Sequence, residues 1–187
     1  DAEAVKKALE EVRSGTLFGR ILGQGGALTG KVLGVRRIPA VKGQVMAAYE
    51  PRAIKGHGVT LATSTMGADH TAGFTIREGL DSHERKGQVE ASGRMQVNGM
   101  IYDSLGICLF AHVAVKERHD ILAGMINGRW GIKWSAGDLR EMAIRALREE
   151  KEFNRRAGLG PAADRLPEIF SEEASPSSGT RFDFSPE

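Results

Sequence analysis

The sequence predicts a largely helical fold in which glycine-rich loops join the helices. Two features support this prediction. Apolar residues recur at spacings of three and four in several stretches, and glycine and proline are concentrated between residues 16 and 58. The 187 residues are 41% hydrophobic and 27% charged, which suffices for one domain core or two small ones. We therefore expect a folded helical protein.

The chain opens with an amphipathic helix pattern and then changes character. Val5, Leu9 and Val12 share one helical face, and Gly15 follows as the expected C-cap. Closely spaced glycines and prolines in residues 16–58 favour loops and short helices. Because buried irregular backbone must find hydrogen-bond partners, we expect this stretch to wrap a ligand or a second domain.

Two further helices are expected in the middle of the chain. The first carries one apolar face and bends near Gly106, so that Cys108 points inward. That face comprises Val97, Ile101, Leu105 and Cys108. The second covers about residues 118–128, with Asp120 near its start, where the helix dipole favours an acid. Its expected buried stripe comprises Ile121, Leu122, Met125 and Ile126.

The strongest local helix signal lies between Ser135 and Gly158. Ser135 and Asp138 match a capping box weakly, and Gly158 ends the pattern. Its apolar side comprises Leu139, Met142, Ala146, Leu147 and Phe153, while the opposite side alternates in charge and predicts an ion-paired surface. The Ser- and Pro-rich residues 171–187 lack periodicity and are expected to lie over the surface.

Composition argues against several classes of function. The formal net charge is +2 and charges of both signs alternate along the chain, so a nucleic-acid partner is not expected. The most apolar run, residues 107–115, is too short to cross a bilayer, so no membrane span is expected. The single cysteine, Cys108, excludes an internal disulfide and any metal cluster held by several thiolates of this chain alone.

Residues 55–73 form the first segment with the composition of a binding site. Glycines, hydroxyls, an acid and two histidines crowd into this stretch. Glycine permits close backbone approach, hydroxyls donate and accept hydrogen bonds, and His70 can exchange a proton near neutral pH. The pattern suits a polar pocket wall, whereas a glycine-rich turn with a structural histidine is the alternative. His57 is interpreted as an ordinary loop residue.

Residues 103–108 form the second such segment, with an acid, a glycine and a thiol among apolar residues. Asp103 could accept paired N–H groups of a ligand, or it could cap the following helical turn. Cys108 could be a ligand or a small buried hydrophobe. A zinc-stabilised helical domain is a further hypothesis, in which Cys108 and His112 would be joined by His70 or His83.

Five stretches occur together in an order and spacing that resembles the aldehyde:ferredoxin oxidoreductase family. They are SGTLFGRILGQGG, RIPAVKGQVMAAYEPRAIKGHGVTLATSTMGADHTAG, YDSLGIC, EFNRRAG and DRLPEIF, between about residues 14 and 170. The resemblance implies an all-α, multihelical portion from the C-terminal part of a larger oxidoreductase. It also implies oxidation of a small aldehyde to a carboxylic acid, with electrons passing to ferredoxin.

The resemblance also implies cofactors and residue roles. A tungsten or molybdenum ion held by two molybdopterins and a four-iron four-sulfur cluster are expected, with the other cluster ligands outside this chain. Asp103, with neighbouring Gly106 and Ile107, matches the pterin-contacting motif, and Cys108 matches its cluster cysteine. His70 matches a histidine proposed to move a proton near the metal. Ile107 stands where relatives have Leu, a mild change.

These expectations divide the chain into three parts. Residues 1–58 would pack on an upstream domain, residues 59–170 would form a helical cofactor wall, and residues 171–187 would form a surface tail. The resemblance further implies that catalysis needs the N-terminal region or subunit, and that the enzyme is cytoplasmic, as a reduced thiol and an oxygen-sensitive cluster would require. A non-catalytic helical scaffold derived from the same family is the alternative.

Overall fold

The computed structural model describes residues 1–76, 78–116 and 118–184. Within these ranges helices dominate, and the strands are limited to one hairpin with two residues on each side. The predicted all-α fold with glycine-rich loops is therefore confirmed. None of the described helices is both long and apolar enough to cross a membrane.

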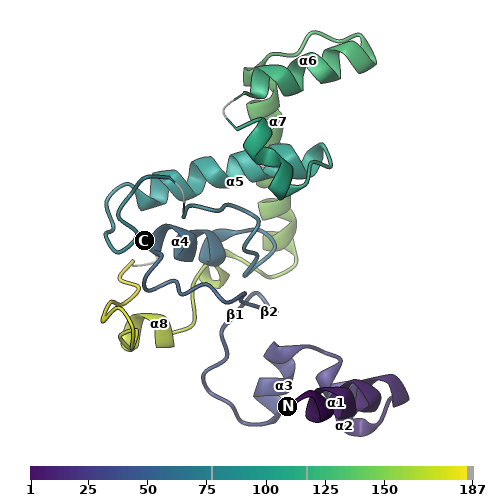
Figure 1. Ribbon diagram of the computed structural model, residues 1–187, viewed down its shortest axis with the longest axis vertical. Helices are drawn as coiled ribbons and strands as arrows, with labels where there is room; N and C mark the ends of the chain where they lie inside the picture. The colour runs from purple at the N-terminus through teal and green to yellow at the C-terminus, as the bar shows by residue number, and fades with distance from the viewer. Residues whose placement is uncertain (77, 117, 185–187) are drawn as a thin grey trace.

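Three short helices form the N-terminal lobe, drawn in purple in Figure 1: α1 (Ala2–Ser14), α2 (Leu17–Leu22) and α3 (Gly26–Val32). The Asp1 carboxylate accepts a bond from the Ala4 amide at 2.8 Å, and Gly15 ends α1 with φ 65°. The predicted first helix and its C-cap are thus confirmed. Its apolar stripe is nevertheless largely exposed, with Leu9 64% accessible.

A tight hairpin leads from this lobe toward the remaining helices. Strands β1 (Ala40–Val41) and β2 (Gln44–Val45) pair antiparallel. The two turn residues, Lys42 and Gly43, have φ values of 50° and 86°. Positive φ at both positions is typical of a type I′ turn, which matches the twist of a two-residue hairpin. Residues 16–58 therefore do consist of loops and short elements, as predicted.

The main body is built on α4 (Lys55–Thr63), α5 (Gln88–Ser104) and α7 (Ala136–Arg156), with α4 packed on α5 and α5 on α7. One apolar core joins α5, α6 and α7 around Ile101 and Leu139, and a second joins β1, α4 and the C-terminal segment around Leu61. Helix α4 runs across the expected boundary between residues 58 and 59, so the domain limits stay a prediction.

Helix α5 ends before Cys108, which corrects one prediction. Gly106 adopts φ 67°, and the amides of Gly106 and Ile107 bond to the carbonyls of Asp103 and Tyr102 at 3.1 and 2.8 Å. These two bonds form a Schellman motif, which terminates a helix rather than bending it. Cys108 lies beyond it and is exposed, so the expectation that it points inward was wrong.

The last two long helices lie where the sequence predicted them, but they do not bury all of the predicted side chains. Helix α6 (His119–Trp130) buries Leu122 and Ile126, but Met125 is 66% exposed because α6 projects from the body and is covered on one side only (Figure 1). Helix α7 begins with the predicted capping box of Ser135 and Asp138. Near its other end Phe153 is 72% exposed, so the expected apolar side is only partly buried.

The C-terminal segment packs more deeply than its composition suggests. Short helices η1 (Leu109–Ala114), η2 (Pro161–Ala163) and α8 (Ile169–Glu172) complete the element order. Beyond them the Phe182 amide bonds to the Phe170 carbonyl at 2.8 Å, and the Phe182 ring is buried in the second core. Residues 171–184 are therefore more than a surface tail, and residues 185–187 lie outside the described residues.

Candidate functional site

A pocket of about 430 Å³ lies where the chain leaves the C-terminal end of α4. It brings together three separate segments: the residues after α4, the second half of α5 and the middle of α7. Its lining residues are Ser64, Thr65, Met66, Asp69, Thr71, Ala72, Gln96, Met100, Asp103, Ser104, Leu147 and Glu150. The two polar segments singled out in the sequence thus share one pocket.

His70 does not itself line the pocket, but lies beside Asp69, an acid of the pocket wall. Its Nδ1 is 3.9 Å from Oδ1 of Asp69, and its side chain is 43% exposed. The Asp69 carboxylate is held in place by Thr71, whose hydroxyl donates to Oδ2 at 2.8 Å and whose amide donates to Oδ1 at 3.1 Å. The Asp69 carboxylate is thus fixed by Thr71, whereas His70 lies beyond hydrogen-bond distance of it and is accessible to solvent.

An aromatic cluster packs behind His70. The Tyr49 ring stacks on the His70 ring at a centroid distance of 5.6 Å, and it meets His57 and Phe74 edge to face at 5.1 and 5.5 Å. Sequence reasoning missed Tyr49, because it precedes α4 by several residues and only the fold returns the segment after α4 to it. Edge-to-face and offset-stacked rings are favourable arrangements that restrict ring orientation.

His57 is a buried helical residue, which corrects its interpretation as an ordinary loop residue. It lies in α4 with 0% exposure, and neither ring nitrogen makes a hydrogen bond of good geometry among the described residues, although the Gly73 backbone lies close enough to affect the pKa of His57. Burial lowers the pKa of His57 to about 4, with the Gly73 backbone opposing the shift and the His70 charge adding to it. The side chain is therefore a neutral imidazole near pH 7.

Asp103 faces the same pocket from the last turn of α5. It lies inside the helix, so the alternative that it caps a following helical turn was wrong. Burial raises the pKa of Asp103, and the carboxylates of Asp69 and Glu150 raise it further. No lysine or arginine lines the pocket, so this described wall favours a ligand with N–H donors over a phosphate.

Gly106, Ile107 and Cys108 lie outside the pocket lining, in the turn that follows α5. Gly106 supplies the left-handed residue of the turn, and the exposed Cys108 immediately precedes η1. The structure therefore joins Asp103 and the His70 segment in one pocket and leaves Cys108 at the adjoining surface. The alternative of Cys108 as a small buried hydrophobe was wrong.

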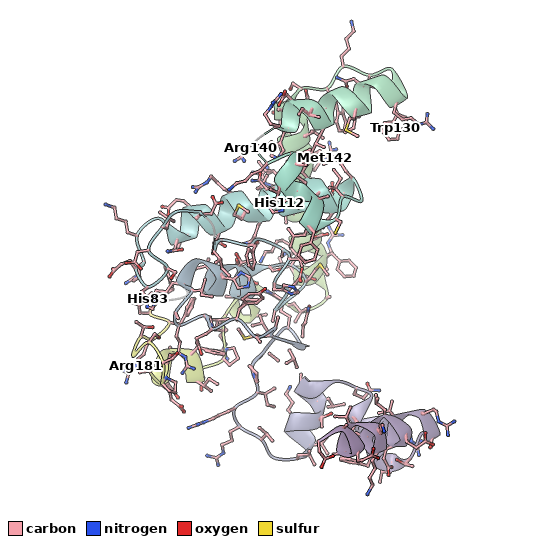
Figure 2. All side chains as sticks on the ribbon, viewed as in Figure 1. His83, His112, Trp130, Arg140, Met142 and Arg181 are labelled. Atoms are coloured by element: carbon pink, nitrogen blue, oxygen red, sulfur yellow. The ribbon has the colours of Figure 1, made fainter. Side chains whose placement is uncertain are left out.

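The zinc hypothesis lacks a ligand group in the described part of the chain. No three histidine, cysteine, aspartate or glutamate side chains converge there on a metal position. His112 instead has its Nδ1 in contact with the Leu109 carbonyl, and Figure 2 shows His83 far from His112, toward the other end of α5. Tetrahedral zinc requires three or four protein ligands, so Cys108 and His112 are insufficient.

Comparison with known proteins identifies the family. The chain belongs to the aldehyde ferredoxin oxidoreductase family, whose model for domains 2 and 3 matches residues 1–185. Similar proteins are the tungsten-containing aldehyde ferredoxin oxidoreductases of Pyrococcus horikoshii, 31% identical over 169 residues, and Pyrococcus furiosus, 27% identical over 186 residues. These alignments cover 85% and 94% of this chain, but only 28% and 30% of the relatives.

Proposed function

We propose that this chain forms one wall of the active site of an aldehyde-oxidising enzyme that passes electrons to ferredoxin. The observation that carries the proposal is the shared pocket, whose lining includes Asp103 and Asp69, with His70 next to Asp69 and outside the lining. The activity and metal in the names of the relatives support the reaction class and the tungsten cofactor. Because the chain spans under a third of those relatives, the remaining catalytic groups would come from another region or subunit.

His70 would move the proton in this reaction. Converting an aldehyde and water into a carboxylic acid releases two protons and two electrons. Nδ1 of His70 lies 3.9 Å from Asp69, and the side chain is exposed enough to pass a proton from the edge of the pocket to solvent. A metal–pterin group oriented by Asp103, together with an iron–sulfur cluster held in part by Cys108, would supply the redox chemistry for the two electrons.

Asp103 suits the role of a pterin-orienting residue. A carboxylate can accept two parallel N–H bonds, and a pterin ring carries amino and ring N–H donors of that geometry. The pocket lining supplies acids and no cations, which fits the ring rather than its phosphate. Gly106 and Ile107 would offer their backbone groups to the ligand from the turn beside Asp103. The hydrogen bonds of this turn also fix the position of the next residue, Cys108.

Cys108 suits the role of a single cluster ligand. Its thiol is exposed at the surface of this chain, where thiolates from another segment can approach. One thiolate holds no four-iron cluster alone, so the other cluster ligands would lie elsewhere in the enzyme. A cytoplasmic, reducing location would suit such a cluster.

Cofactor content and turnover test this function together. The enzyme that contains this chain is purified without oxygen, and its tungsten, molybdenum, iron and pterin contents are measured with aldehyde-dependent reduction of ferredoxin. Cys108→Ala should lower iron, while the exposed control Ser171→Ala should not. If the enzyme that contains this chain and the rest of the active site holds no metal and no pterin, the catalytic proposal is wrong and the scaffold alternative remains.

A further inference from the structure

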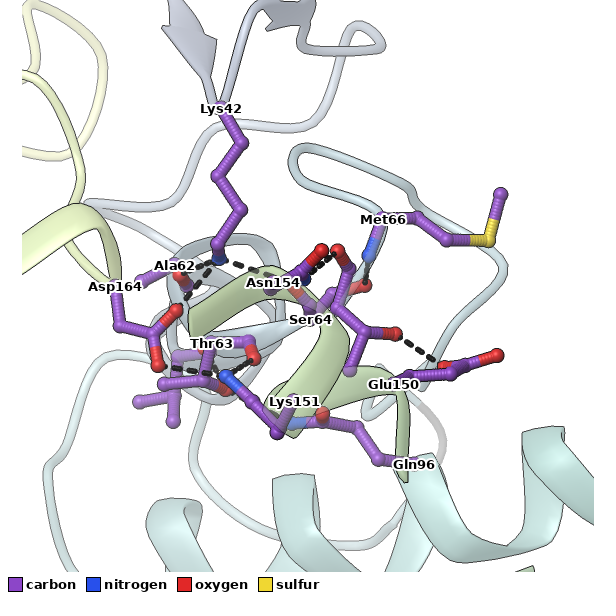
Figure 3. A network of polar contacts seen from close by, with 12 residues as sticks. Lys42, Ala62, Thr63, Ser64, Met66, Gln96, Glu150, Lys151, Asn154 and Asp164 are labelled. Carbon is purple, nitrogen blue, oxygen red and sulfur yellow. Dashed lines mark hydrogen bonds and ion pairs between the residues drawn. The ribbon is translucent and has the colours of Figure 1, made fainter. Parts of the chain in front are cut away.

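The C-terminal end of α4 is held by side chains from distant parts of the chain. The last carbonyls of a helix lack partners within the helix, and they carry the negative end of its dipole. Helix α4 has no basic residue in its own last turn. Yet four consecutive carbonyls there, those of residues 62–65, accept bonds from side chains that lie outside α4 (Figure 3).

Lys42 supplies two of these bonds from the tip of the hairpin. Its Nζ donates to the carbonyls of Ala62 and Ser64 at 3.1 and 2.8 Å, and it lies 2.7 Å from Oδ1 of Asp164. An ammonium group has three N–H donors, so all three are used. The Lys42 side chain is 3% exposed, and breaking such a buried pair by removing one partner is unfavourable.

Asp164 couples Lys42 to a second lysine, on α7. Lys151 Nζ lies 2.6 Å from the other carboxylate oxygen of Asp164, and it donates to the Thr63 carbonyl at 2.5 Å. One turn along α7, Asn154 donates to the Thr65 carbonyl at 2.7 Å. The hairpin, the segment after η2 and α7 therefore meet at the exit of α4, as Figure 3 shows.

The hairpin also touches the pocket wall at a second point. Gly67 has φ 95°, and a Cβ added there would lie 2.5 Å from the Val41 carbonyl oxygen and 3.3 Å from Cβ of Lys42. The Lys42 side chain thus holds the chain before Gly67, and the hairpin backbone packs against Gly67 itself. Asp69 and His70 follow two and three residues later, so little chain separates these contacts from the proton-moving group.

We propose that Lys42, Asp164 and Lys151 act as a clamp that positions residues 64–70, which include Asp69 of the pocket lining and the adjacent His70. This inference rests on the proposed function for its catalytic consequence. The three side chains are positioning residues, because none of them lines the pocket. Their bonds converge on the segment that links the buried helix α4 to the pocket wall. Losing these bonds should therefore increase local opening of that segment while the apolar cores stay folded.

The test compares Lys42→Met with Lys6→Met in the complete enzyme. Lys6 lies on α1, its side chain is 71% exposed and, among the described residues, its one ion pair is with Glu3 of the same helix, so it controls for the loss of one lysine. Amide hydrogen exchange is followed in residues 62–72 and, for comparison, in α6. The kcat and KM for aldehyde are measured on the same preparations.

Lys42→Met should speed exchange in residues 62–72 by about 10-fold while α6 stays unchanged, since local opening differs between parts of a fold. A slightly misplaced group lowers turnover, so kcat should fall by roughly 10- to 100-fold with KM changed less than about threefold. Lys42→Arg should recover part of the lost kcat, because it keeps the buried charge.

Unchanged exchange in residues 62–72, or equal acceleration in α6, would overturn the clamp. If Lys42→Met does not fold, Asp164→Asn and the more exposed Lys151→Met test the same prediction. Exchange is measured independently of turnover, so an enzyme that oxidises no aldehyde would refute the proposed function without deciding the clamp. Normal exchange with slow turnover in Lys42→Met would refute the clamp alone.

Discussion

The Tyr49 ring stacks on the His70 ring at an interplanar angle of 26°, although 20 residues separate them in the sequence. In the sequence, helix α4 lies between the two loops that carry Tyr49 and His70. His57 of this helix contacts the Tyr49 ring edge to face. The orientation of the candidate proton-moving group therefore depends on the path of the chain into and out of α4.

His70→Gln should lower kcat for aldehyde oxidation by roughly 100-fold or more, because a positioned proton carrier contributes about that much. Its KM should change little, since His70 is not assigned a binding role. His83→Gln, a change at an exposed loop histidine, is the matched control. Comparable turnover of His70→Gln and the control would remove His70 from the mechanism.

His57→Phe should raise the free energy of unfolding by about 1–3 kcal/mol, because it removes two buried polar atoms that make no well-formed hydrogen bond within the described part of the chain. Chemical denaturation at pH 7 measures this change. Phenylalanine keeps an aromatic ring against Tyr49 and Phe74, so the cluster should survive. A loss of stability would instead show that the His57 nitrogens have a stabilising partner in the enzyme.

The same variant should respond differently to acid. The folded pKa of His57 is about 4, below its ordinary value of 6.5, so the unfolded chain binds the proton more readily. The contribution of His57 to the wild-type free energy of unfolding is thus fully present above about pH 6.5 and is lost as the pH falls toward 4. In His57→Phe that contribution to the decline should be absent, and parallel curves for the two proteins would contradict the buried, neutral state of His57.

Asp103→Asn should reduce the pterin content of the purified enzyme, because the amide replaces an acceptor oxygen with a donor group. Asp120→Asn, at an exposed ion pair on α6, is the control. Since burial raises the pKa of Asp103, wild-type pterin retention should begin to fall at a higher pH than the ordinary aspartate pKa of 3.8 predicts. Equal pterin in both variants would exclude Asp103 from binding.

Ser135→Ala should destabilise the protein by about 1 kcal/mol, because it removes the N-cap of α7. Denaturant unfolding measures the loss, with Ser14→Ala as a control in the last turn of α1. Helix α7 carries Glu150, Lys151 and Asn154, so fraying from this end should weaken the pocket wall less than the clamp substitutions. No difference between Ser135→Ala and the control would show that the cap contributes nothing.

Helix positions could be predicted wherever the determinants are local. The stripe and Gly15 of α1, the approximate range of α6, and the capping box of α7 are all contained within one helix length. Burial could not be predicted in the same way. The apolar stripe of α1 has the spacing of a buried face, yet it is exposed in this chain. Periodicity predicts which residues share one side of a helix, but it does not predict whether another element covers that side.

The sequence by itself determined the helical fold class and the two polar segments, since composition and spacing are properties of contiguous residues. The family followed from the resemblance of several stretches to known sequences. Only the tertiary structure decided that these segments share a pocket, that Tyr49 stacks on His70, and that His57 is buried. It also decided that two lysines hold the exit of α4. Such relationships depend on chain segments separated by tens of residues, whose approach is set by the packing of α4, α5 and α7 rather than by any local pattern.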